Sequence, residues 1–137
     1  YVTRRTDFEE VGLPLRTIDG EGRLVPDAMK DDLSVVAVLP GGKLVILTGC
    51  SHAGIVNIAR HSLELTGQKG IRAILGGLHL VEAPLDRIRK TADALAGLPI
   101  ESVYAGHCTG FDAQVELRKT FGDRFRPLQT GMRFEFP

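Results

Sequence analysis

The stretch Leu44-Val-Ile-Leu-Thr-Gly-Cys-Ser-His-Ala-Gly-Ile-Val-Asn57 passes from an aliphatic run, through a turn that contains glycine, into a second apolar segment. This change of pattern is typical of a strand that leads into a helix, and we predict the helix over 53–65. A second β-branched run at 33–39 precedes the stretch, and the two are separated by Pro-Gly-Gly-Lys. The spacing predicts an antiparallel hairpin with strands at 33–39 and 44–47.

Strands and helices alternate along the rest of the chain. Further strands are predicted at 71–75 and 100–105, and a helix is predicted at 112–121. Another helix follows Pro84, and one apolar face of it is formed by Leu85, Ile88, Ala92 and Leu95. This alternation predicts an α/β fold with a mixed sheet. The final segment, 132–136, alternates apolar and charged residues as a half-buried strand does.

Length and composition indicate a single domain over 1–137, with a surface loop or short hairpin at 12–32. The 17 basic residues balance the 17 acidic ones, which disfavours nucleic acid and anionic membranes as partners. No apolar run approaches the roughly 20 residues of a membrane-spanning helix, and the chain opens without a signal-peptide pattern. We therefore expect a cytoplasmic protein with reduced thiols, and the initial Tyr1 suggests a fragment or a processed product.

The chemically informative feature is a glycine followed within three residues by a histidine at the end of three predicted strands. The histidines are His52, His79 and His107. Ligands bind α/β sheets at the carboxyl ends of the strands, so these imidazoles are expected to converge there. Imidazole and thiolate are good donors for zinc or iron, which makes a metal site the leading hypothesis.

Each candidate also has a structural interpretation. His52 and His107 are metal ligands in one interpretation, and helix caps or packed histidines in the other. Cys50 is a ligand, a nucleophile or a small buried residue, and Cys108 has the same alternatives. His79 stands between two leucines, which suits a packed histidine as well as one that contacts substrate.

A serine hydrolase is the second chemical hypothesis. The turn Gly49-Cys-Ser-His-Ala53 differs from a nucleophile elbow only at its last glycine, and it would place Ser51 at an exposed apex. His107 and either Asp86 or Asp112 would complete a triad. The structural alternative for Ser51 is an N-cap of the following helix.

The segment Leu44–Asn57, together with Gly76-Gly-Leu-His-Leu80 and Gly106-His-Cys-Thr-Gly110, resembles the metallo-β-lactamase fold superfamily. Within that superfamily the motifs are most similar to the branch of dihydropterin-ribofuranosylaminobenzene phosphate synthase-like metallohydrolases. The resemblance covers most of the chain from about Arg4 onward.

The resemblance implies the carboxy-terminal half of an αββα sandwich, with helices on one face of the sheet. It implies a metal-dependent hydrolase with a zinc-type centre, dinuclear in the complete enzyme, in which iron or manganese can replace zinc. His52, or else Cys50, would take the place of the usual bridging acid, and His107 would complete the second metal site. His79 would have a catalytic role at the cleft of a small phosphorylated or pterin-like substrate.

One motif of the superfamily is absent from this sequence. The His-x-His-x-Asp-His motif, which supplies most metal ligands, does not occur. We therefore expect the chain to need the missing amino-terminal half, another chain or self-association to cover its sheet. A non-catalytic half-domain that assembles with a partner is the third functional hypothesis.

Overall fold

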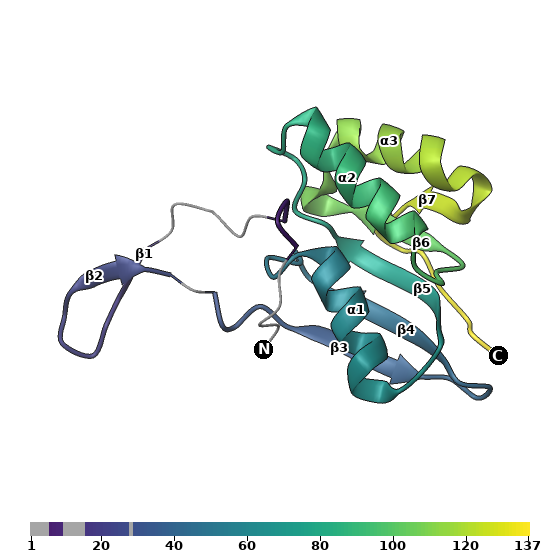
Figure 1. The fold of residues 1–137 in the computed structure, drawn as a ribbon, viewed down its shortest axis with the longest axis horizontal. Coiled ribbons are helices and arrows are strands. Elements are labelled where there is room, and N and C mark those ends of the chain that lie inside the picture. The colour runs from purple at the N-terminus through teal and green to yellow at the C-terminus, as the bar shows by residue number, and fades with distance from the viewer. Residues whose placement is uncertain (1–5, 10–15, 28) are drawn as a thin grey trace.

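The computed structural model describes residues 6–9, 16–27 and 29–137. In this part of the chain a five-stranded sheet carries three helices on one of its faces (Figure 1). The strands are β1 (Arg16–Ile18), β2 (Leu24–Pro26), β3 (Ser34–Val38), β4 (Lys43–Thr48), β5 (Gly70–Gly77), β6 (Val103–Gly106) and β7 (Phe125–Pro127). The helices are α1 (Ile55–Thr66), α2 (Leu85–Ala96) and α3 (Phe111–Phe121), and short 3-10 turns occupy His107–Thr109 and Gly122–Arg124. None of the described helices has the length and apolar character needed to cross a membrane.

The sheet has the order β3-β4-β5-β6-β7, and its first pair is antiparallel while the other pairs are parallel. The predicted hairpin and the predicted mixed α/β sheet are therefore confirmed. Each parallel pair is joined through a helix, and the strands are added in one direction. Because such crossovers share one handedness, α1, α2 and α3 all lie on the same face.

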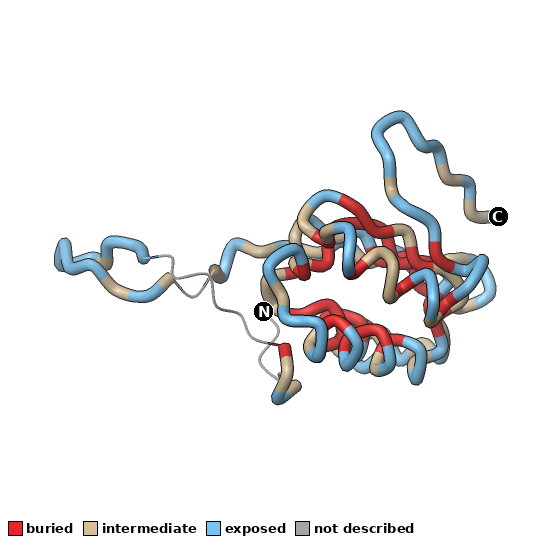
Figure 2. Tube along the Cα trace, turned by 90° about the horizontal axis from the view of Figure 1, so that it is seen from above, coloured by how far each residue is buried: buried red, intermediate tan, exposed pale blue. Residues whose placement is uncertain are grey.

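The main core lies between the sheet and its helices. Leu44 and Ile46 of β4 point into it and are fully buried, as is Ile74 of β5. Figure 2 shows the buried segments gathered in this body of the molecule. The helices contribute most of the apolar residues that the sequence predicted at helical spacing, namely Ile88, Ala92, Leu95, Ala113, Leu117 and Phe121. Leu85, predicted on the same face of α2, is instead 46% exposed, because it is the first residue of the helix.

The opposite face of the sheet has a much smaller cluster. Val45, Ala73 and Leu75 are buried there, and partly buried hydrophobic residues pack against them. Val35 and Leu47, which pair across β3 and β4 on this face, stay 55% and 46% exposed. The sheet thus has one covered face and one incompletely covered face.

The strand predicted at 132–136 is wrong. These residues form no strand, although Phe134 and Phe136 are half-buried and their rings stack 6.3 Å apart. The alternation therefore reflects a C-terminal tail that packs on the sheet. The ring of Phe134 lies edge-on to that of Tyr104, with 4.6 Å between the ring centroids. The last strand of the structure is β7, which no sequence pattern predicts, because it is short, contains Pro127 and buries only Phe125.

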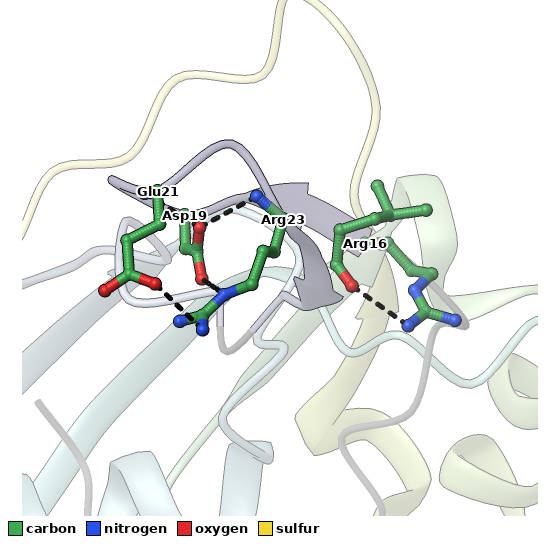
Figure 3. Close-up of polar contacts among 5 residues, drawn as sticks. Arg16, Asp19, Glu21 and Arg23 are labelled. Atoms are coloured by element: carbon green, nitrogen blue, oxygen red, sulfur yellow. Dashed lines mark hydrogen bonds and ion pairs between the residues drawn. The ribbon is translucent and has the colours of Figure 1, made fainter.

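The predicted loop or hairpin at 12–32 contains an antiparallel hairpin of β1 and β2, which stands apart from the main sheet in Figure 1. Residues 12–15 and 28 lie outside the described residues. Figure 3 shows Asp19 accepting hydrogen bonds from the backbone and the guanidinium of Arg23, both at 2.9 Å. Arg16 donates to the carbonyl of Leu24 across the pair at 3.1 Å.

The first long helix begins at Ile55, two residues later than predicted. Gly54 has a φ of 89° and therefore cannot be part of the helix. The carboxylate of Glu9 accepts the backbone N–H groups of Val56 and Asn57 at 2.8 and 3.1 Å. A side chain distant in sequence thus accepts hydrogen bonds from the first backbone N–H groups of α1. No local sequence pattern predicts this contact.

Candidate metal centre

The ends of β4, β5 and β6 meet at one edge of the sheet, because these three strands are parallel neighbours. Hydrogen bonds join the loops that follow them. Gly77 donates to the carbonyl of Gly49 at 2.8 Å, and Leu78 donates to the hydroxyl of Thr109 at 3.1 Å. The convergence of the three glycine-histidine strand ends is therefore confirmed.

His52 and His79 form one group at this edge. Their ring centroids lie 4.3 Å apart, with an angle of 57° between the planes. His79 Nδ1 is buried and makes no hydrogen bond to the described residues. Burial and the neighbouring His52 lower the pKa of His79, which favours the neutral imidazole with a free lone pair.

Cys50, His107 and Cys108 form the second group. One ligand atom of each, a sulfur or a ring nitrogen, lies within 4.8 Å of those of the other two. Burial raises the pKa of Cys108 to about 11, and the adjacent Cys50 adds to the rise. This rise favours the protonated thiol of Cys108.

The predicted site residues are thus divided between two neighbouring groups. Cys50 and His107, both predicted ligands, lie together, while His52 contacts His79. The sequence left Cys108 open, and the geometry places it with the predicted ligands. The roles of His52, His107 and Cys50 as ligands and of His79 as a catalytic residue stay predictions.

Each of the three turns contains a non-glycine residue with a positive φ. The values are 60° at Ser51, 48° at His79 and 51° at His107. This left-handed region is uncommon for residues other than glycine, although asparagine, aspartate and histidine occupy it more often than most, and it costs on the order of 1 kcal/mol or more per residue. Such outliers cluster at functional sites, which agrees with the position of the three turns.

The serine hydrolase hypothesis requires an exposed Ser51, and this requirement is not met. Ser51 is 2% exposed, and its hydroxyl donates to the carbonyl of Gly77 at 2.6 Å. The N-cap alternative is also wrong, since Gly54 precedes α1 and supplies no side-chain cap. Asp86 pairs with Lys90 on the surface, and Asp112 is exposed at the start of α3. Ser51 instead ties the turn after β4 to the end of β5.

One acidic residue near the site was missed by sequence reasoning. The carboxylate of Asp32 accepts the N–H of Ala53 at 3.2 Å, and its charge acts on His79. Asp32 immediately precedes the hairpin and carries no motif, so only tertiary structure brings it to the edge. Glu82 also acts electrostatically on His79.

The donor set at this edge fits a borderline or soft divalent metal. Two thiols and one imidazole lie close enough for a single ion to draw them together. The unpaired, buried Nδ1 of His79 is a further nitrogen without a protein partner in the described structure. Carboxylates, the preferred ligands of magnesium and calcium, are not part of the three-residue group.

Comparison with known proteins gives three informative matches, and no family model matches the chain. The chain is 36% identical over 115 residues to a 7,8-dihydropterin-6-methyl-4-(beta-D-ribofuranosyl)-aminobenzene-5'-phosphate synthase of Methanocaldococcus jannaschii. It is 33% identical over 97 residues to an uncharacterised protein of the same organism. Among solved structures it matches Tm1679, described as a metal-dependent hydrolase of the β-lactamase superfamily, with a TM-score of 0.79 and 30% identity.

The matches cover most of this chain and less than half of each relative. The synthase match covers 84% of the chain and 39% of the synthase, and the second covers 71% and 34%. The Tm1679 match covers 86% of the chain and 45% of that structure. The chain therefore corresponds to only part of the fold of these proteins.

Proposed function

Since this chain belongs to the metallo-β-lactamase superfamily over the part of the fold that it spans, we propose that it forms one side of a metal-dependent hydrolytic centre. The observation that carries the proposal is the meeting of imidazole and thiol groups at the ends of β4, β5 and β6. His52 and His107 are proposed as metal ligands, with Cys50 as a further ligand. We propose zinc as the metal, with iron or manganese as substitutes.

When bound, such a metal supplies Lewis-acid chemistry, in that it polarises the scissile bond and lowers the pKa of a water molecule. The chain's own residues hold the site in place. Ser51 fixes the turn that carries His52, through its hydrogen bond to Gly77. We propose that His79, which lies beside His52 and whose Nδ1 makes no hydrogen bond to the described residues, contacts the substrate or takes part in proton transfer.

The proposed substrate is a small phosphorylated molecule related to pterins. This class comes from the name of the synthase relative and from the resemblance of the motifs. It agrees with the balance of 17 basic and 17 acidic residues, which gives the chain no net positive charge to attract a polyanion.

The proposal includes a partner that completes the site and covers the exposed sheet face. Val35 and Leu47 leave apolar surface on that face. The two Methanocaldococcus jannaschii relatives are each more than twice as long as the segment that matches this chain. The partner is the missing amino-terminal half, another chain or a second copy. Light scattering at increasing protein concentration tests self-association directly.

The first experiment is measurement of metal per chain by plasma mass spectrometry, on protein purified without added metal or a metal-binding tag. We expect near-stoichiometric zinc, iron or manganese in the wild type and its loss in the His52→Ala/His107→Ala double variant. His61→Ala, which removes a histidine from the middle of α1, is the matched control and is expected to keep the metal.

Hydrolysis is tested with bis(p-nitrophenyl) phosphate on the same preparations. Release of nitrophenolate by the wild type and the His61→Ala variant, with loss in the double variant, supports the proposal. Metal binding without any hydrolysis by the chain, alone or with a purified complementary segment, contradicts the hydrolytic role and favours the non-catalytic half-domain.

A further inference from the structure

Cys108 is the residue of the strand-end turns whose role the predicted site leaves open. Its sulfur lies within 4.8 Å of the ligand atoms of Cys50 and His107. These three residues, here called the thiol cluster, come from two turns that are 58 residues apart at the cysteines. The fold therefore brings together two thiols and an imidazole that no local motif of the sequence joins.

The position of Cys108 is fixed by several hydrogen bonds. Its sulfur accepts the N–H of His79 at 3.3 Å and donates to the carbonyl of Cys50 at 3.7 Å. Its own carbonyl accepts the N–H groups of Leu80 and Val81, both at 3.0 Å. The sulfur is thus held toward Cys50 by backbone groups from two other turns.

The glycine at the end of β5 makes room for this arrangement. A Cβ atom on Gly77 would lie 2.6 Å from the sulfur of Cys108 and 3.5 Å from the Cα of Cys50. Both distances show that the cysteines pack directly over the backbone of Gly77. Any larger residue there would push the thiol cluster apart, so a close backbone approach explains the glycine.

The thiol cluster is also only partly buried. Cys50 and Cys108 are half-buried, whereas His107 is exposed. A fully buried pair of thiols would behave as small apolar residues, whereas both cysteines here keep part of their surface in solvent beside an exposed imidazole. His107 has a positive φ of 51° and begins the short 3-10 turn, and its imidazole lies beside the sulfurs.

We propose that Cys50, Cys108 and His107 bind one soft or borderline divalent cation of the zinc type, through two sulfurs and one ring nitrogen. The inference deepens the proposed function, since it rests on metal binding at this edge and assigns the donor set. It adds Cys108 to the proposed ligands Cys50 and His107, while the ring of His52 lies beside that of His79 at the same edge. Three protein donors leave a fourth position open, as in catalytic zinc sites.

Charge balance supports a divalent ion. On binding, each thiol releases one proton to the buffer and forms one sulfur–metal bond, while His107 stays neutral and donates a lone pair. Two thiolates then neutralise the two positive charges. The half-buried site therefore gains no net charge, which avoids the cost of burying an unpaired ion.

The test is titration of Co²⁺ into the metal-free full chain in a non-thiol reductant, followed by the near-ultraviolet thiolate-to-cobalt absorption band. We expect a saturable band at one ion per chain. Cys108→Ser, a nearly isosteric change, is expected to lose about half of the band intensity and to weaken binding by about 10- to 100-fold. Cys50→Ser is expected to behave in the same way, and circular dichroism verifies that both variants fold.

His61→Ala is the matched control, because it removes an imidazole from the middle of α1, outside the thiol cluster and the strand-end turns. We expect it to keep the full band. Absence of a band in the wild type, or an unchanged band and affinity in Cys108→Ser, overturns the inference.

The same variants separate this inference from the proposed function. Stoichiometric metal and hydrolysis without a thiolate band refute only the thiol cluster. A thiolate band without hydrolysis in the completed protein refutes only the hydrolytic function.

Discussion

The two faces of the five-stranded sheet differ in how completely this chain covers them. On the helix face, Leu44 and Ile46 of β4 are fully buried beneath α1 and its neighbours. On the opposite face of the same strand, Leu47 stays 46% exposed and Val45 is covered by a small cluster and the C-terminal tail. β4 therefore packs into a complete core on its helix face and is only partly covered on its other face.

The difference shows where the stability of this chain resides. Burial of apolar surface stabilises by roughly 25 cal/mol per Å², so the helix face contributes most of the favourable free energy. The opposite face keeps apolar side chains in water, and such a surface is typical of a face that another layer covers. The comparison predicts that substitutions on the two faces have unequal costs.

The largest expected effect comes from Leu44→Ala. This substitution leaves a cavity in the helix-face core and is expected to lower the free energy of unfolding by about 2–5 kcal/mol. Leu47→Ala, on the same strand but the other face, is expected to cost less than about 1 kcal/mol. Urea unfolding followed by circular dichroism measures both.

An equal loss of unfolding free energy in Leu44→Ala and Leu47→Ala would contradict the difference between the two faces. If Leu47→Ala were as destabilising as Leu44→Ala, the exposed face would already be covered in solution, for instance by a second copy. Repeating the unfolding at several protein concentrations distinguishes this case, because a covered dimer face gives concentration-dependent stability.

The next effect concerns the attachment of the N-terminal segment to the helix layer. Glu9→Ala removes the acceptor of the N–H groups of Val56 and Asn57, and is expected to lower the free energy of unfolding by about 1–3 kcal/mol. Asp7→Ala, an exposed acidic residue of the same segment, is the control and should cost less than about 0.5 kcal/mol. Hydrogen exchange at Val56 locates the loss, and unchanged protection there would contradict the role of Glu9.

The same carboxyl group gives a pH dependence. Burial raises the pKa of Glu9 above its ordinary 4.5, so the folded state holds this proton more tightly than the unfolded state. The contribution to stability is fully present below pH 4.5 and is lost as the pH rises through the folded pKa, with a slope of at most about 1.4 kcal/mol per pH unit. The free energy of unfolding, measured against pH for the wild type and for Glu9→Gln, should show this slope only in the wild type. The same slope in both proteins would refute the assignment to Glu9.

A smaller effect is expected on the incompletely covered face. Phe134→Ala removes the edge-on ring contact with Tyr104 and is expected to cost about 0.5–1.5 kcal/mol. The control is Phe111→Ala, because Phe111 is 79% exposed at the start of α3 and should be nearly neutral. A cost for Phe134→Ala above that of Leu44→Ala would mean that the tail, and not the helix layer, dominates stability.

The smallest effect is expected at the surface ion pairs that border the sheet. Glu101 pairs with Lys43 and, at 2.6 Å, with Arg72, yet all three side chains are solvent-accessible. Glu101→Gln is therefore expected to cost less than about 1 kcal/mol, and the cost should shrink further at high salt. A large loss of unfolding free energy that does not depend on salt would contradict the solvent-accessible position of the Glu101 side chain.

Sequence patterns predicted the elements wherever local periodicity and burial agreed. The hairpin around Pro40, the helix after Pro84 and the helix-face residues of α2 follow from such patterns. The pattern failed at 132–136, where alternation without a neighbouring strand gave only a packed tail. It also failed at β7, which is too short to show a period.

The local runs and spacings of the sequence are sufficient to predict the fold class and the positions of the three glycine-histidine turns, and the resemblance of its motifs indicates the relation to metal-dependent hydrolases. Tertiary structure alone decided that Cys108 joins Cys50 and His107, that Ser51 is buried, and that Glu9 caps α1. These facts depend on contacts between residues far apart in the chain. Parallel strand order brings such residues together, and no local pattern encodes which side chain then faces which.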